Sequence, residues 1–82
     1  MNEVIEEVIE MLEVLLEEEL APKVRTIIEE VLSSLKALDE EPDSQEIIKI
    51  QDELETLTNS GQIDSFARNE LFNVTSLLES LL

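Results

Sequence analysis

The chain contains neither cysteine nor histidine, and these two absences remove most of the familiar chemistry of enzymes. Without imidazole it has no side chain that ordinarily titrates near neutral pH, and without a thiol it has no thiolate nucleophile. The nitrogen and sulfur ligands of a typical zinc site are missing as well. We therefore expect a protein that is not an enzyme, with no bound metal or cofactor and no small-molecule substrate.

Tryptophan and tyrosine are also absent, and the chain has one glycine, two prolines and two phenylalanines. So few turn-forming residues disfavour an all-β fold, and the lack of cysteine excludes a scaffold held by disulfides. The 82 residues correspond to one domain, near the lower size at which a single core is stable. Leu, Ile and Val must fill that core, which favours helices packed on helices.

Positive charge is scarce, because 21 acidic residues face only 5 basic ones and the net charge is −16. A nucleic-acid surface needs clustered Lys and Arg, so we expect no nucleic acid as a partner. An anionic membrane surface would repel the chain for the same reason. The start Met1-Asn2-Glu3 lacks the basic segment of a signal peptide, and no apolar run reaches the length of a membrane span. We expect a cytoplasmic location.

Apolar residues recur at helical spacing in four segments, and we predict helices over residues 2–19, 22–38, 44–60 and 65–81. The first has a broad apolar arc opposite an acidic face with eight Glu, where Val14 is the one apolar residue. An arc this broad should contact two neighbouring helices. Pro22 suits a first helical turn, residues 39–43 form the central loop, and Gly61 is placed as the C′ residue after the third helix. Candidate N-caps are Asn2, Asp43 in a capping box with Glu46, and either Asp64 or Ser65.

The chain contains an internal repeat. The segment Leu20 to Arg25 recurs 43 residues later as Ile63 to Arg68, each with an apolar residue, a helix break and an arginine. The predicted equivalences include Met11 with Leu54, Val14 with Leu57, Ile28 with Leu71, Val31 with Val74, and Leu35 with Leu78. We predict an all-α, antiparallel, up-down-up-down four-helix bundle built from two duplicated αα-hairpins. A two-hairpin solenoid is the alternative, although solenoids usually need three or more repeats.

Four features of the chain stand out together: Ala21-Pro22-Lys23-Val24-Arg25, Asp64-Ser65-Phe66-Ala67-Arg68, Phe72 and Leu78-Glu79-Ser80-Leu81. In these features the chain resembles a family of small archaeal all-helical proteins, the uncharacterised protein family 0147. The chain departs from the family with Ser65 in place of Pro, Phe72 in place of Trp, and Asn59-Ser60-Gly61 in place of an Asp-Pro-Asn-type turn. The resemblance implies a helical bundle in an archaeal cytoplasm. It implies no activity, because the family has none established.

Arg25 and Arg68 are the only arginines in the chain, and each falls in the first turn of its predicted helix. One hypothesis is an anion or carboxylate clamp, because the guanidinium fork matches carboxylates and phosphates. The other is a structural role, in which each arginine pairs locally or holds the hairpin turn. The carboxylates of Glu29 and Asp64 lie four residues away. We favour the structural role.

Phe72 is the most distinctive candidate for an interaction. It projects away from the apolar stripe of the fourth helix, beside a neutral polar arc that includes Asn69 and Ser76. The second and fourth predicted helices carry four acidic residues between them, so we predict one weakly charged side made by these two helices. Such a side suits a contact with a protein partner or with further copies of the chain, whereas a solitary exposed Phe is the alternative. Glu70 falls at the apolar edge of the same helix, where it should reach solvent or pair locally.

The acidic runs 17–19 and 39–43 are interpreted as solvated surface, with weak binding of divalent cations as the alternative. These observations favour a small acidic interaction or structural module. The alternative is an acidic module that binds a basic protein or divalent cations through the Glu-rich face of its first helix.

Overall fold

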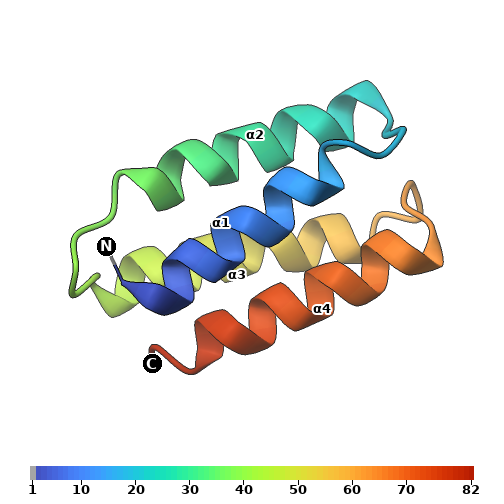
Figure 1. Ribbon diagram of the computed structural model, residues 1–82. Coiled ribbons are helices and arrows are strands. Elements are labelled where there is room, and N and C mark those ends of the chain that lie inside the picture. The colour runs from blue at the N-terminus through green and yellow to red at the C-terminus, as the bar shows by residue number, and fades with distance from the viewer. Residues whose placement is uncertain (1) are drawn as a thin grey trace.

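The computed structural model describes residues 2–82, and this part of the chain contains four α-helices joined by short connections and no strand. They are α1 (Glu3–Leu15), α2 (Pro22–Lys36), α3 (Ser44–Thr58) and α4 (Ser65–Glu79). Each helix packs against the next in the chain, and α1 also packs against α4, which closes the ring (Figure 1). The predicted antiparallel four-helix bundle is confirmed. None of the described helices combines the length and apolar character needed to span a membrane.

The helices begin where local sequence signals place them. The side-chain oxygen of Asn2 accepts the backbone N–H of Val4 at 2.9 Å, and that of Asp64 accepts the N–H of Ala67 at 2.8 Å. These N-caps satisfy backbone donors that have no partner inside the helix. Pro22 occupies the first position of α2, where a missing N–H costs nothing.

The start of α3 is capped differently from the prediction. The carboxylate of Asp43 accepts the backbone N–H of Gln45 at 2.9 Å, so Asp43 is the N-cap as expected. Among the described residues, however, no hydrogen bond joins the Glu46 side chain to the backbone N–H of Asp43. The predicted capping box is therefore wrong, because Asp43 caps the N–H of the second helical residue and not that of Glu46.

The helices end earlier than predicted. α1 stops at Leu15 instead of residue 19, and the other three each end two residues before the predicted position. Residues 17–19 are all glutamate, and negative side chains are unfavourable at the negative end of a helix. α3 ends at Thr58 with Asn59 as its C-cap, so Gly61 lies one position beyond C′, with φ of 74°.

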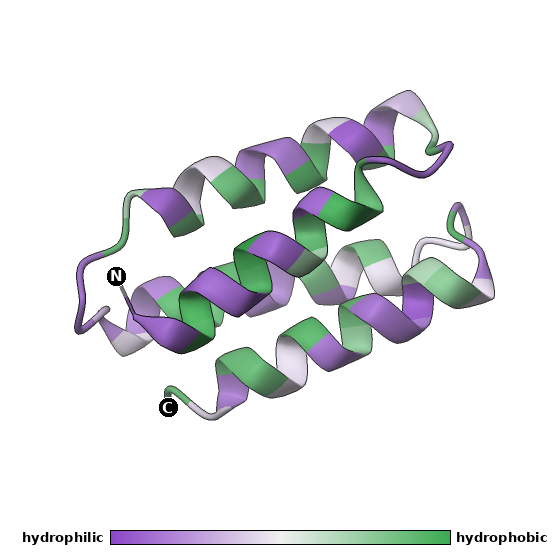
Figure 2. Cartoon of the chain, in the orientation of Figure 1, coloured by the Kyte–Doolittle hydropathy of each residue, from purple (hydrophilic) through white to green (hydrophobic). Residues whose placement is uncertain are grey.

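The core is entirely aliphatic. Apolar and polar residues alternate in bands along each helix (Figure 2), and the apolar bands meet inside the bundle. The broad apolar arc of α1 contacts both α2 and α4, as its width predicts. The buried side chains of α1 are Ile5, Val8, Ile9, Leu12 and Leu15, and those of α4 are Ala67, Leu71, Val74 and Leu78.

α2 and α4 occupy diagonal positions in the bundle. The neighbouring helix pairs are α1 with α2, α2 with α3, α3 with α4, and α1 with α4, and within residues 2–82 the α2 and α4 helices are not neighbours. The predicted weakly charged side shared by the second and fourth helices is therefore wrong. Alternate helices of an up-down-up-down ring face opposite directions, so their outer surfaces cannot combine into one.

The structural repeat differs from the sequence repeat by one residue in its first half. Leu12 and Leu54 are both fully buried and lie 42 residues apart, whereas Ile28 and Leu71 lie 43 apart. The predicted equivalence of Met11 with Leu54 is therefore wrong. So is that of Val14 with Leu57, because Val14 is 49% exposed and Leu57 is 2% exposed. The second hairpin carries one extra residue between its two core stripes.

Candidate interaction surfaces

Arg25 joins α2 to the end of α1. One guanidinium nitrogen donates to the carbonyl of Leu16 at 2.9 Å and to the carbonyl of Glu18 at 3.2 Å. These carbonyls follow the last turn of α1, where no backbone N–H is available to them. The charge lies near the N-terminus of its own helix, but its hydrogen bonds are at the C-terminus of the preceding helix, where a cation is favourable.

Arg68 makes the same connection in the second hairpin. Its Nε donates to the carbonyl of Thr58 at 3.3 Å, at the end of α3. Both arginines are half-buried at the end of the bundle that holds the α1–α2 and α3–α4 connections (Figure 1). Neither forms an ion pair with the carboxylate four residues away in the described chain, so the predicted pairing with Glu29 and Asp64 is wrong. Their hydrogen bonds to the ends of α1 and α3 agree with the predicted role in holding the hairpin turn, which stays a prediction.

The solvent side of α4 is uncharged over most of its length. We define the α4 face as the outward residues of this helix between its first residue and Ser76, all of which are exposed. They occupy one contiguous arc of the helix at about 100° per residue. Its members are Ser65, Phe66, Asn69, Phe72, Asn73 and Ser76. By contrast, the exposed residues of α1 are five glutamates and Val14.

Both aromatic residues of the protein belong to the α4 face. Phe72 is 57% exposed and Phe66 is 49% exposed, whereas the core contains no aromatic side chain. They lie on opposite edges of the face, with Asn69, Asn73 and Ser76 between them. Phe72 borders a small hollow of about 120 Å³ between α3 and α4, which Glu55 also lines. The candidate residues Phe72, Asn69 and Ser76 are therefore brought together, and Arg25 is not among them.

Phe66 was not identified from the sequence as a candidate, although a signal for it was present. It lies between the N-cap Asp64 and Arg68 in the second helix break, where its type is explained equally well as part of the break motif. Phe66 is exposed, and its separation of six residues from Phe72 sets the two rings about 120° apart around the helix, at the two edges of the α4 face. Glu70 is half-exposed, in agreement with a carboxylate that reaches solvent along the edge of α4.

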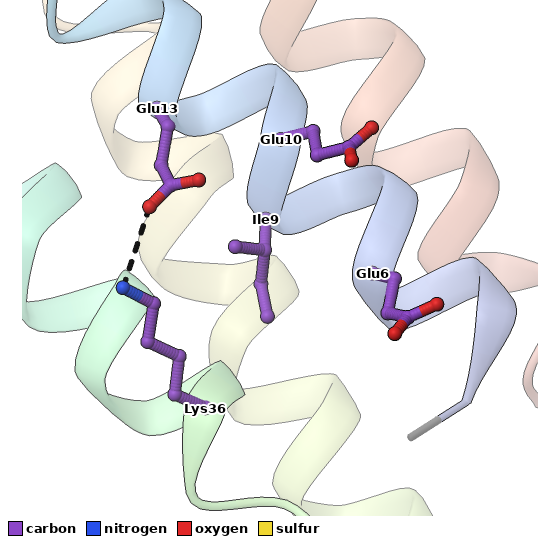
Figure 3. A pocket seen from close by; sticks show the side chains of 5 residues that line it. All are labelled: Glu6, Ile9, Glu10, Glu13 and Lys36. Carbon is purple, nitrogen blue, oxygen red and sulfur yellow. Dashed lines mark hydrogen bonds and ion pairs between the residues drawn. The ribbon is translucent and has the colours of Figure 1, made fainter.

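A second surface of interest lies on α1. A shallow hollow of about 550 Å³ is lined by Ile9 at its floor, by Glu6, Glu10 and Glu13, and by Lys36 from α2. The Lys36 ammonium donates to the Glu13 carboxylate at 3.4 Å, and both side chains are about half exposed. Such a pair contributes little to stability because water screens it. In Figure 3 the carboxylates of Glu6 and Glu10 point away from Lys36.

The acidic residues do not converge on a common point. Within residues 2–82, no group of three carboxylates has an arrangement that would hold a metal ion. The glutamates of α1 are spread along the helix, each with access to solvent. The surface is therefore a field of negative charge with an apolar floor at Ile9, which suits a large cationic partner better than a single ion.

The model of an uncharacterised protein family (UPF0147) matches residues 1–81, nearly the whole chain, and confirms the resemblance seen in the helix breaks. No curated protein and no solved structure matches the chain.

Proposed function

Because the chain belongs to uncharacterised protein family UPF0147, whose function is unknown, we propose its function from its surface: it is a non-enzymatic protein-binding module that docks through the α4 face. One observation carries this proposal. The chain has two aromatic side chains, and both are exposed on α4, the only one of the helices within residues 2–82 whose outward arc is free of charge over three turns. The encounter would take place in the cytoplasm, the compartment expected from the sequence.

The composition of the α4 face matches that of an interface centre. The centres of protein interfaces are depleted in charged residues and enriched in aromatic ones, and a few aromatic anchors contribute most of the binding energy. Elsewhere the chain places charge at most exposed positions. A phenylalanine on the surface gains nothing from the core, so two on one uncharged arc are better explained by a contact that covers them.

Affinity capture from a native lysate of the source organism tests the proposal. The bait proteins are the wild type, the double variant Phe66→Ser with Phe72→Ser, and the control Val14→Ser. Val14 is an exposed apolar residue of similar exposure that lies among the glutamates of α1. We expect a partner that the wild type and the Val14 variant recover and that the double variant loses. Equal recovery by all three baits would contradict the proposal.

A second candidate function is favoured by the hollow on α1. A basic segment of another protein would contact Ile9 through an apolar residue and the surrounding glutamates through Lys or Arg. Salt separates the two candidates, because a contact centred on Phe72 survives moderate salt, whereas one made mainly of charges weakens steeply. Glu6→Gln with Glu10→Gln should weaken only the second kind of binding.

A further inference from the structure

The borders of the α4 face are set by the neighbours of α4 in the ring. α4 packs between α1 and α3, and its outward arc is therefore flanked by these two helices and not by α2. On the α3 side the border includes Glu55, which lines the same hollow as Phe72. This carboxylate is exposed and lies beside the edge of the face.

The α1 side is also acidic. The edge of α1 that faces α2 is identified by the ion pair of Glu13 with Lys36. The opposite edge carries Met11, half-buried against the core, and Glu7, one helical turn before it and exposed. Since the other neighbour of α1 is α4, Glu7 lies on the α4-facing edge of α1. The α4 face thus has a neutral polar centre with one phenylalanine at each edge. Glu7 flanks it on the α1 side and Glu55 on the α3 side, where Arg68 also lies, with its Nε engaged at the Thr58 carbonyl.

From this arrangement we infer that the α4 face binds a basic amphipathic helix of another protein, with an apolar stripe on Phe66 and Phe72 and with Lys or Arg residues against both acidic borders. This inference rests on the proposed function and names the partner chemistry of the same site. The face from Ser65 to Ser76 extends about 17 Å at a rise of about 1.5 Å per residue. That length matches the apolar stripe of a helix of three turns.

A second copy of the chain fits this site poorly. Two α4 faces in a symmetric contact would place the acidic borders of one copy against those of the other. Each copy also carries a net charge of −16. Like charges that face each other across an interface disfavour association, whereas a basic border satisfies both edges of the face.

The test uses synthetic 18-residue peptides and fluorescence anisotropy. The probe peptide has a leucine stripe flanked by lysines, one control has glutamate in place of lysine, and the other has serine in place of leucine. The proteins are the wild type, Phe66→Ser with Phe72→Ser, Glu7→Gln with Glu55→Gln, and Glu29→Gln with Glu30→Gln. The last pair removes the same charge from exposed positions of α2, which is not a neighbour of α4 in the bundle.

We expect the leucine–lysine peptide to bind the wild type and both control peptides to bind much more weakly. Loss of the two phenylalanines should raise the dissociation constant about thirtyfold, as for aromatic anchors at other interfaces. The Glu7 and Glu55 pair should raise it about fivefold, and the α2 pair less than about twofold, because rim charges act locally in moderate salt. Circular dichroism should show every variant folded, since all substituted side chains are exposed.

Each other outcome contradicts a defined part of the reasoning. If the leucine–lysine peptide does not bind, or if the two glutamine pairs have equal effects, the inference of a basic partner is wrong. The capture experiment then still tests, independently, whether the α4 face binds a protein. Binding that does not depend on the phenylalanines would contradict both the basic partner and the proposed function. Self-association of the wild type that Phe72→Ser abolishes, measured by sedimentation, would identify a second copy as the occupant and overturn this inference alone.

Discussion

Replacement of Arg25 by alanine tests how the two halves of the first hairpin are held together. The substitution removes the side chain that joins the start of α2 to the end of α1. It leaves the carbonyls of Leu16 and Glu18 without their protein donor. The bond to Glu18 is exposed and the bond to Leu16 is partly buried, so the loss is mainly that of the hydrogen bonds themselves and not of a fully buried unsatisfied group.

The magnitude follows from the geometry of these bonds. Hydrogen bonds that involve a charged group contribute about 1.5 to 3 kcal/mol, and partial exposure lowers this to about 1 kcal/mol each. Two bonds at 2.9 Å and 3.2 Å therefore give a loss of about 2 kcal/mol for Arg25→Ala. In a domain of this size that corresponds to a fall of about 10 °C in Tm. Arg68→Ala should cost about 1 kcal/mol, because it removes one longer bond.

Thermal unfolding followed by circular dichroism in low and in 1 M NaCl measures the effect. Lys23→Ala is the matched control, because it removes one positive charge from the same end of α2. In low salt both variants lose favourable charge, but in 1 M NaCl screening should leave only the cost of the hydrogen bonds. If Arg25→Ala is no less stable than Lys23→Ala in 1 M NaCl, the assigned role of Arg25 is refuted.

Three further predictions concern charge, the turn and the register of the repeat. The Tm of the wild type should rise between 10 mM and 1 M NaCl, as the Debye length falls from about 30 Å to about 3 Å; calorimetry that shows a constant Tm would mean that self-repulsion is negligible. Gly61→Ala should cost about 1 kcal/mol in urea unfolding, because φ is 74° although space is open around the residue, and Gly61→Asn should cost less. Val14→Ala should change stability by less than about 0.5 kcal/mol. Leu57→Ala should cost about 3 kcal/mol or prevent folding, and similar costs for the two would contradict the one-residue shift of the repeat.

The helices and their inward faces could be predicted because the signals for them are local. Asn2 and Asp64 act on backbone groups two or three residues away, and Pro22 restricts only its own turn. The apolar spacing of each helix likewise defines its buried side without reference to any other helix. The helix ends were less predictable, because the last turn depends on partners such as Arg25 that lie in the next helix.

The candidate surface was predicted only in part. Phe72, Asn69 and Ser76 share an arc of one helix, so their grouping follows from helical geometry alone. The residues that border this arc on other helices do not follow from the geometry of one helix. The border at Glu55, and the separation of the face from α2, depend on which helices pack together, and a charge count per helix contains no information on that.

By itself, therefore, the sequence determined that the chain forms four amphipathic helices in two hairpins and that its chemistry does not rely on histidine or cysteine. Capping, helix breaks and apolar spacing act over a few residues, so they produce the same local structure whatever the tertiary arrangement is. Only the tertiary structure decided that α2 and α4 lie diagonally and that Leu12 matches Leu54. It also decided that the arginines bind carbonyls at the end of the preceding helix or just after it. Each of these depends on how side chains distant in sequence fill one shared core.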